Sequence, residues 1–449
     1  MRCEVHSPAQ FILIAAAGLW VAFMVNAFAQ EAIGTTASLP SRSEPIAPIS
    51  ENVPPSPSFD SAPSFQSSDV REEVSSEPRR FQYGLQITVR GVYDDNINIS
   101  QTNPTSDFYF TIEPVLTLGF GDIEGRQENF IRLDYAPGLF LFADHSENNA
   151  VQHAIRLRGQ HPFSRLTVGL SEEIAILDGT DLRTLANVSA PGTHANIDVN
   201  SRTQFQTFNT RLNASYDLTG KTFLSTEFGS LVTHYDSSSL FSSAHFSENL
   251  FINYRYSDKL VFGVGGTGGY NFVDAPNPDQ TFEQANVRAT YQASGKISLT
   301  FSGGLEFRQF EDNSRDQSVS PVFDLSATYR ATDGTTFNLG ASHRIYNSGV
   351  LAAQNYAQTI LDVTVRQRFL RRCYLSLAAG YQHSDYYSTV SGVSTNRQDD
   401  YYYFEPAADF SVTRFWTVGA YYLRRENDST LQSFSFDNNQ VGFRAALVF

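Results

Sequence analysis

The residues that could carry out chemistry in this chain do not stand in a pattern typical of an enzyme. Nine histidines are spread along the sequence, and none occurs in a metal-binding spacing such as His-Glu-x-x-His. No motif pairs a nucleophile with a base. Of the two cysteines, Cys3 precedes an apolar N-terminal run, which leaves Cys373 without a disulfide partner once that run is removed. The sequence therefore predicts a protein that is not an enzyme and that holds no metal and no cofactor.

Charged residues instead alternate with apolar residues over many short segments. In residues 400–412, Tyr402, Phe404 and Phe410 have one parity, and Glu405 and Asp409 have the other. Neighbouring side chains of a β-strand point to opposite faces. An arginine that faced lipid near the middle of a membrane would cost about 2–4 kcal/mol, so membrane strands turn such charges inward. We therefore expect a membrane barrel with an apolar outer face and a charged lumen.

The same parity gives the residues that we expect to line the lumen and to set its selectivity. The arginines of this set are Arg90, Arg132, Arg156, Arg158, Arg211, Arg255, Arg288, Arg308, Arg330, Arg344, Arg366 and Arg444. The acidic residues are Glu113, Asp134, Glu173, Asp217, Glu227, Glu306, Asp324, Asp362, Glu405 and Asp409. Such a lumen could pass ions and solutes, or salt-bridged ladders could fill it and leave no conducting path. The expected width of the barrel favours a channel.

The elements that position these residues are predicted to form a single transmembrane antiparallel up-and-down β-barrel, an all-β fold, over residues 81–449. The alternating segments predict about 18 strands, and 16 would also be compatible. The predicted strands cover residues 82–93, 107–119, 128–141, 149–160, 165–177, 204–218, 222–234, 246–256, 259–272, 281–292, 296–309, 319–330, 335–346, 355–368, 372–385, 400–412, 415–426 and 437–449. Proline removes a ladder donor, so Pro114, Pro321 and Pro406 should each mark a local distortion.

The connections between these segments alternate in length. Short ones such as 219–221 and 257–258 are followed by longer polar ones such as 235–245. Outer-membrane barrels have short periplasmic turns and long extracellular loops, which is the pattern seen here. The longest connection is 178–203, and in general porins the corresponding loop folds inward and narrows the channel. It would supply the constriction candidates Asp181, Arg183, His194 and Asp198. A solvated surface loop is the alternative.

The first 80 residues have a different character. Residues 11–25 are an unbroken apolar run, and Ala27-Phe28-Ala29 follows as a small-x-small cleavage site, so residues 1–29 are predicted to be a signal peptide. A single spanning helix is the alternative, but the run is shorter than the roughly 20 residues that a span needs. Residues 31–80 hold eight of the 18 prolines and are rich in serine and acids. Residues 30–80 are therefore expected to form a disordered periplasmic tail.

The overall composition excludes some partners and suggests others. The formal net charge of −15 argues against nucleic acid, because phosphate binding needs clustered positive charge. Aromatic residues make up 13% of the chain and charged residues only 18%, which fits strands with one face in lipid. We expect the barrel to lie in the outer membrane of a Gram-negative cell, in contact with lipid and lipopolysaccharide. The oligomeric state stays open.

Two groups of residues resemble known families. The C-terminal run 443–449, with Phe443, Leu447 and Phe449, resembles the terminal signal that outer-membrane barrels present to the barrel-assembly machinery. The segments 91–97 (GVYDDNI), 422–427 (YLRREN) and 436–439 (FDNN) resemble the outer-membrane family catalogued as putative β-barrel porin 2. That resemblance covers about residues 81–449. It implies location and architecture, and some members are linked to export of surface polysaccharide.

Three functions are compatible with these observations. The first is a porin-like channel that passes small hydrophilic solutes through the charged lumen. The second is an export barrel for an acidic surface polysaccharide, in which the inner arginines would form a ladder for a polyanion. The third is a closed structural barrel with a sealed lumen. The width of the barrel favours the channel, and the other two remain as alternatives.

Overall fold

The chain folds into one closed sheet of 18 antiparallel strands. The computed structural model describes residues 81–449 except 122–128, 181–195, 312–314 and 392–394, so the predicted signal peptide and tail lie outside the described residues. The strands are β1 (Phe81–Asp94), β2 (Asp107–Gly121), β3 (Phe130–Phe142), β4 (Ala150–Pro162), β5 (Leu166–Asp178), β6 (Gln204–Asp217), β7 (Thr222–Tyr235), β8 (Ser243–Ser257), β9 (Leu260–Val273), β10 (Gln280–Ser294), β11 (Ile297–Phe310), β12 (Ser318–Thr332), β13 (Thr335–Asn347), β14 (Gln354–Phe369), β15 (Cys373–Ser388), β16 (Gln398–Ser411), β17 (Trp416–Ser429) and β18 (Phe436–Val448).

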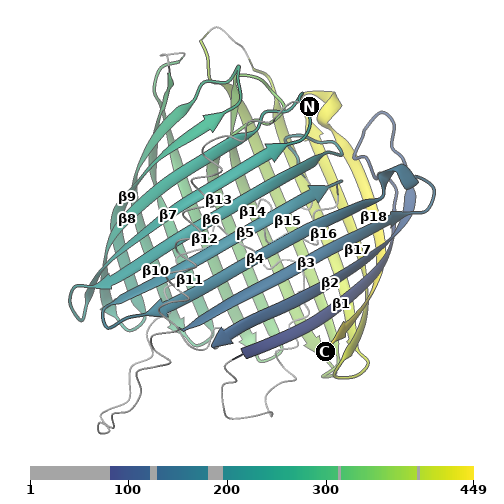
Figure 1. Ribbon diagram of the computed structural model, residues 1–449, viewed down its shortest axis with the longest axis horizontal. Helices are drawn as coiled ribbons and strands as arrows, with labels where there is room; N and C mark the ends of the chain where they lie inside the picture. Colours follow the sequence, from purple (N-terminus) through teal and green to yellow (C-terminus); the bar gives the residue numbers. More distant parts are fainter. Residues whose placement is uncertain (1–80, 122–128, 181–195, 312–314, 392–394) are drawn as a thin grey trace, which may run out of the picture.

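Each strand pairs with its neighbours in the sequence, and the first and last strands close the ring (Figure 1). β1 pairs with β2 on one side and with β18 on the other, with Arg90 directly opposite both Thr111 and Arg444. This is an up-and-down barrel, and the prediction of 18 strands is confirmed. No helix of the described residues is long and apolar enough to span a membrane.

Two of the three prolines interrupt strand pairing as expected. The paired positions of β2 and β3 stop at Ile112 and resume at Leu116, so that Pro114 lies in an unpaired stretch. The pairing of β16 with β17 skips Pro406 in the same way. A proline has no N–H to donate, so the ladder opens where it faces the next strand. Pro321, by contrast, precedes the paired part of β12 and β13 and keeps its pairing to β11.

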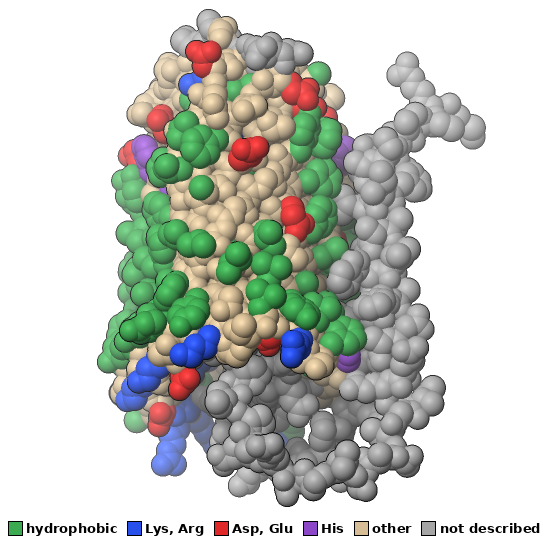
Figure 2. All heavy atoms as spheres, turned by 90° about the vertical axis from the view of Figure 1, so that its left-hand side faces the viewer, with side chains coloured by type: hydrophobic (Ala, Val, Ile, Leu, Met, Phe, Trp, Pro, Cys, Tyr) green, Lys and Arg blue, Asp and Glu red, His purple; other side chains and the backbone are tan. Residues whose placement is uncertain are grey.

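Side chains alternate between an apolar outer face and an inner face that is mostly polar. On β2, Phe108, Phe110 and Ile112 are 38–51% exposed, whereas Thr111 and Glu113, which lie between or beside them, are buried. The hydrophobic side chains spread over the outer wall of the barrel (Figure 2). In a strand of a closed barrel, one parity must face outward and the other inward. Lipid on one side and charged groups on the other explain why the sequence alternates.

The two ends of the barrel differ in the length of their connections. At one end, which we call the short-turn end, seven connections have two to four residues by the strand bounds, such as 258–259 and 295–296. The connection between β2 and β3 at this end, 122–129, is longer, and its residues 122–128 lie outside the described residues. The connections at the other end, the long-loop end, run from six residues (274–279) to 25 residues (179–203). Two short 3₁₀ turns, η2 (Ser146–Asn148) and η5 (Gln432–Phe434), lie in long loops. The C-terminus lies at the short-turn end (Figure 1).

Candidate functional site

Six of the lumen arginines form ion pairs of 2.8 Å or less with acidic side chains of the inner wall, and Arg158 and Arg255 form longer ones. The N–O distance is 2.7 Å for Arg132–Asp134, Arg344–Asp324 and Arg444–Asp409, and 2.8 Å for Arg156–Glu173 and Arg308–Glu306. Arg90 donates to Glu113 over 2.7 Å through its Nε. These pairs bring together residues that parity alone had assigned to the same face. Whether they set selectivity is a prediction that the geometry does not test.

The other predicted lumen residues have more varied surroundings. Arg288 donates to Asn253 Oδ1 over 2.7 Å and lies 4.4 Å from the ring of Phe251. Arg366 lies 4.8 Å from the ring of Tyr374. Glu405 and Asp362 are 6% and 1% exposed, respectively, and neither carboxylate oxygen of Asp362 has a hydrogen-bond partner among the described residues. Arg211, on β6, lies in register with Arg158 of β4 through Ser171 of β5.

The charges near the short-turn end remain accessible to solvent. The side chain of Arg158 is 43% exposed and lies 3.8 Å from Asp134, which also pairs with Arg132. Arg255 and Asp217 form an ion pair of 2.9 Å with exposures of 33% and 49%. Water that reaches these groups keeps the cost of holding a charge inside the barrel low. This part of the lumen can therefore present charge to a solute.

Polar side chains bridge the lumen closer to the long-loop end. Gln280 of β10 and Asn355 of β14 are fully buried and exchange two hydrogen bonds, of 3.1 and 2.8 Å, although three strands separate them in the sheet. Arg308 of β11 donates to the same Gln280 side chain over 2.8 Å. Asn271 of β9 reaches Asn347 of β13 over 3.4 Å. At this level, inner side chains from β9 to β14 therefore contact one another across the lumen.

The loop between β5 and β6 crosses to the opposite wall. The carboxylate of Asp198 accepts hydrogen bonds from Ser348 Oγ (2.8 Å), from the backbone of Gly349 (2.6 Å) and from Tyr386 (3.0 Å). Arg397 donates to the backbone carbonyls of Ile197 and Asp198, each over 3.0 Å. These partners come from the β13–β14 loop, from β15 and from the residue before β16. The described end of the long loop is thus docked against the opposite wall, and whether the loop narrows the channel stays a prediction.

We call the set Asp198, Ser348, Tyr386, Arg397 and Asp399 the latch. Arg397 pairs with Asp399 at 2.6 Å, and both side chains are 1% exposed. The guanidinium carbon of Arg397 also lies 4.3 Å from the ring centre of Tyr386. Burial raises the pKa of the Asp198 carboxyl above its usual range, and Arg397 beside it opposes that rise. A buried charge network of this kind fixes one geometry, because each charge needs its partner.

Apolar residues from two long loops pack beside the latch. Ile197 and Ile99, from the β5–β6 and β1–β2 loops, form a buried cluster with Tyr401, Tyr403 and Leu423 of the wall. Ile99 has a φ of 45°, which is unusual for a β-branched residue. The β1–β2 loop therefore has a strained backbone at Ile99, and the packing of the Ile99 side chain stabilises that conformation. The mouth is filled on this side by protein.

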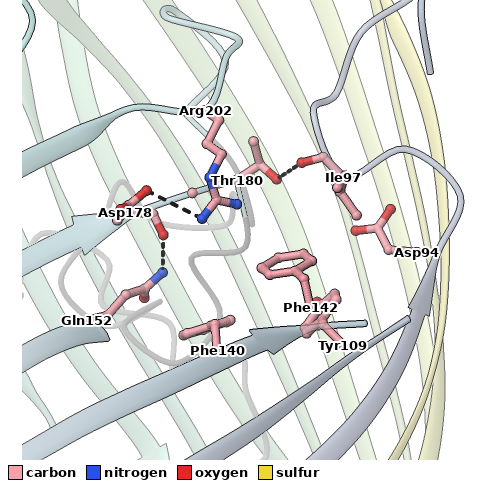
Figure 3. A pocket seen from close by; sticks show the side chains of 10 residues that line it. Asp94, Ile97, Tyr109, Phe140, Phe142, Gln152, Asp178, Thr180 and Arg202 are labelled. Atoms are coloured by element: carbon pink, nitrogen blue, oxygen red, sulfur yellow. Dashed lines mark hydrogen bonds and ion pairs between the residues drawn. The ribbon is translucent and has the colours of Figure 1, made fainter. Parts of the chain in front are cut away.

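The stem of the β5–β6 loop leaves a narrow pocket against the wall of β1 to β4 (Figure 3). Arg202 lies 3.4 Å from Asp178 and 5.2 Å from the ring of Phe142, and Gln152 donates to the backbone carbonyl of Asp178 over 2.7 Å. The Oε1 atom of Gln152 has no hydrogen-bond partner among the described residues. The pocket leaves room for little more than one water molecule. We interpret it as a junction between loop and wall.

The constriction candidates are only partly described. Asp181, Arg183 and His194 lie outside the described residues, whereas Asp198 is in the latch. Sequence reasoning missed its main partner, Arg397, because the residue was assigned to a polar loop. A signal was present, since Arg397, Asp399 and Tyr401 share the parity of the inward residues of β16. The described residues hold no cluster of three metal-ligating side chains.

The predicted assembly signal lies on the outer face of the last strand. Phe443 and Leu447 are 65% and 41% exposed, and Phe449, the residue after β18, is 68% exposed. The backbone N–H of Phe449 donates to Leu85 over 2.8 Å, so the C-terminus stays attached to β1. An exposed apolar row on a terminal strand suits recognition during assembly, but its role stays a prediction.

A comparison with family models gives one match. The model of the family described as "Putative beta-barrel porin 2" matches residues 268–448. The resemblance predicted from the sequence is confirmed over this range, which includes the segments 422–427 and 436–439 but not 91–97. With the closed barrel, this match indicates a porin-like β-barrel of the outer membrane. No curated protein matches the chain.

Several solved structures of bacterial proteins, an outer-membrane protein among them, are similar to this chain at low identity. OpdK of Pseudomonas aeruginosa has 11% identity and a TM-score of 0.38, with 82% of this chain and 98% of that chain covered. OccK2 (OpdF) of Pseudomonas aeruginosa, solved in complex with glucuronate, has 13% identity and a TM-score of 0.41, with the same coverage. OccAB4 of Acinetobacter baumannii has 11% identity and a TM-score of 0.39, also covering 82% and 98%. None of these values assigns a solute to this chain.

Proposed function

We propose that this barrel is a channel for small hydrophilic solutes, which pass through a charged lumen. The observation that carries the proposal is the solvent-exposed charge inside the closed sheet, namely Arg158 at 43% and the Arg255–Asp217 pair at 33% and 49%. A sealed lumen would tend to bury such groups or pair them completely, because an isolated buried charge is costly. Short turns of outer-membrane barrels face the periplasm, so this hydrated part would open on that side.

Single-channel recording in planar bilayers tests the proposal. We expect steady conductance from the purified protein without any partner, and a reversal potential under a KCl gradient that reports the charge that dominates the narrowest part. A barrel that conducts only after the latch is broken would instead favour the export function, in which the β5–β6 loop has to move. Complete absence of conductance in the native protein and in latch variants would contradict it.

A closed structural barrel is the second candidate, because one observation favours it. The Gln280–Asn355 hydrogen bonds connect two strands that have three others between them, and the latch fills the mouth beside them. The same recordings separate the two functions. Export of an acidic polysaccharide, the other interpretation of the sequence, would need a wide path and predicts little conductance until the β5–β6 loop moves.

The organisation of the chain around the barrel is also a proposal. Residues 1–29 would be removed as a signal peptide, and residues 30–80 would lie in the periplasm as a tail. The mass of the mature protein gives the cleavage site, and labelling of a cysteine placed at Ser58 in intact and in permeabilised cells gives the side of the membrane. Phe443, Leu447 and Phe449 would bind the barrel-assembly machinery, so Phe449→Ala should lower the amount of folded barrel in cells.

A further inference from the structure

The short-turn end of the barrel carries a ring of exposed cations. The described short turns contain seven Lys or Arg residues and only two acidic residues, Asp258 and Asp333. The cations are distributed over six of the seven described turns and are therefore not confined to one side. Lys and Arg side chains gather at this edge, below the hydrophobic wall (Figure 2). The ring consists of Arg165 and of Lys221, Lys259, Lys296, Arg371, Arg372 and Arg414.

These cations are not engaged by acids of the barrel. Among the described residues none of the seven forms an ion pair, and the contacts that do occur are to neutral groups. Lys296 Nζ lies 3.5 Å from the carbonyl of Ala331, and Arg372 Nη1 lies 3.4 Å from that of Val412. Both interactions are long and leave donors available. The positive charge of the ring is therefore open to an external anion.

Each part of the ring stands next to exposed apolar or aromatic side chains. Tyr256 is 66% exposed three residues before Lys259, and Leu370 is 78% exposed directly before Arg371. Arg414 lies 4.4 Å from the ring centre of Phe415, which is 51% exposed. Aromatic side chains with this exposure at a barrel edge mark the boundary between hydrocarbon and headgroups. The ring is thus at the level of the headgroups, on the outer circumference.

The other end of the barrel has the opposite charge. Exposed acids of the described long loops include Asp144, Glu147, Asp236, Asp274 and Asp316, while every arginine described there is partly or fully buried. The contrast shows that the ring does not follow from the composition of the chain, which is acidic overall. A positive edge on an acidic protein indicates an anionic environment at that edge alone.

We propose that the ring binds anionic phospholipid headgroups in the membrane leaflet that the short turns face. The phosphates would lie between the turns, within reach of the lysine and arginine donors, while the acyl chains cover the aromatic girdle. The outward neighbours of the cations favour lipid over a soluble anion, because recruitment of a solute would require the charges to point toward the lumen. This interaction is independent of whether the lumen conducts.

Lipid selectivity at the barrel surface tests the proposal. The full chain is reconstituted in phosphatidylcholine bilayers that contain spin-labelled phosphatidylglycerol or spin-labelled phosphatidylcholine, and the immobilised fraction of each is measured. We expect phosphatidylglycerol to be preferred about fivefold, the ratio that corresponds to about 1 kcal/mol per cation near a charged surface. The preference should fall at high salt. Inorganic phosphate at equal ionic strength should not displace the lipid.

A pair of variants separates contact from overall charge. Lys221→Gln/Lys259→Gln/Lys296→Gln should reduce the preference at least twofold. The control Arg158→Gln/Arg330→Gln/Arg366→Gln removes the same charge from the inner face and should leave the preference intact. An unchanged preference in the lysine variant, or an equal loss in both variants, would overturn the proposal. If the lysine variant fails to fold, Arg371→Gln/Arg372→Gln provides the same comparison on one turn, against Arg158→Gln/Arg330→Gln.

Discussion

Two ion pairs of the barrel interior have similar geometry and very different surroundings. In the latch at the long-loop end, Arg397 and Asp399 lie 2.6 Å apart and are each 1% exposed. Near the short-turn end, Arg255 and Asp217 lie 2.9 Å apart but are 33% and 49% exposed. Exposed pairs contribute about 0–1 kcal/mol, whereas removal of one partner from a buried pair costs about 3–5 kcal/mol. An Arg–Asp ion pair therefore fixes the structure at the mouth, where it is buried, and contributes little to stability at the other end, where it is exposed.

This difference divides the interior into two functional regions. The latch and the Gln280–Asn355 bridge hold loops and walls together by contacts that water does not reach. Near the short-turn end, Arg158 and Arg255 keep part of their surface in solvent. A solute that enters from the short-turn end would meet hydrated charge first and packed protein second. The resistance of the channel should thus reside at the long-loop end.

The largest effect is expected from breaking the latch. Arg397→Gln removes the ion pair to Asp399 and weakens the bonds to the loop carbonyls, and it leaves buried carboxylates without their cation. We expect a loss of about 3–5 kcal/mol in the docking of the loop and a several-fold rise in single-channel conductance. Conductance and the urea midpoint of unfolding are both measured. Arg255→Gln is the matched control, and equal behaviour of the two variants would refute the division into two regions.

The bridge between β10 and β14 should have an intermediate effect. Gln280→Ala removes both hydrogen bonds to Asn355 and one from Arg308, and leaves the amide of Asn355 buried without its partner. A buried polar group left unsatisfied costs about 1–3 kcal/mol. We expect a lower unfolding midpoint and a smaller rise in conductance than in Arg397→Gln. Gln292→Ala, on the exposed part of the same strand, should change neither quantity.

Acid should tighten the latch. Burial raises the pKa of Asp198, so the docked loop holds the proton more firmly than the free loop does. The stability of docking that this proton provides is present at low pH and is lost as the pH rises above the usual aspartate range through the raised pKa. We expect conductance to decrease in acid. Asp198→Asn should remove most of this dependence, and an unchanged pH profile in that variant would exclude Asp198 as its source.

The sequence was sufficient to predict the barrel because a membrane leaves few alternatives. Lipid outside and charge inside force a period of two, and this period placed Arg90 and Glu113, or Arg444 and Asp409, on one face before any contact was known. Arg90 then meets Glu113 on the neighbouring strand, and Arg444 meets Asp409 across Gly419 of the strand between them, once the register is fixed. The local alternation of apolar and polar residues and the lengths of the turns were therefore enough to predict most of the architecture.

The latch could not be predicted in the same way. Asp198 and Arg397 are separated by 199 positions and by about half of the circumference of the barrel, and no periodicity relates a loop to the wall that it reaches. The fold of the loop depends on packing of Ile99 and Ile197 against Tyr401, which is a property of the closed structure. The functional contacts at the mouth are non-local, whereas the lumen charges are set strand by strand.

The smallest effect on stability, and the sharpest on selectivity, is expected at Arg158. Its side chain is 43% exposed and shares Asp134 with Arg132, so Arg158→Gln should change the free energy of unfolding by less than about 1 kcal/mol. It should shift the reversal potential toward cations, because one hydrated positive charge leaves the lumen. Asp134→Asn should shift it toward anions. If neither variant moves the reversal potential while Arg397→Gln raises conductance, then the mouth alone controls which ions pass, and the hydrated charges serve only to keep the short-turn end filled with water.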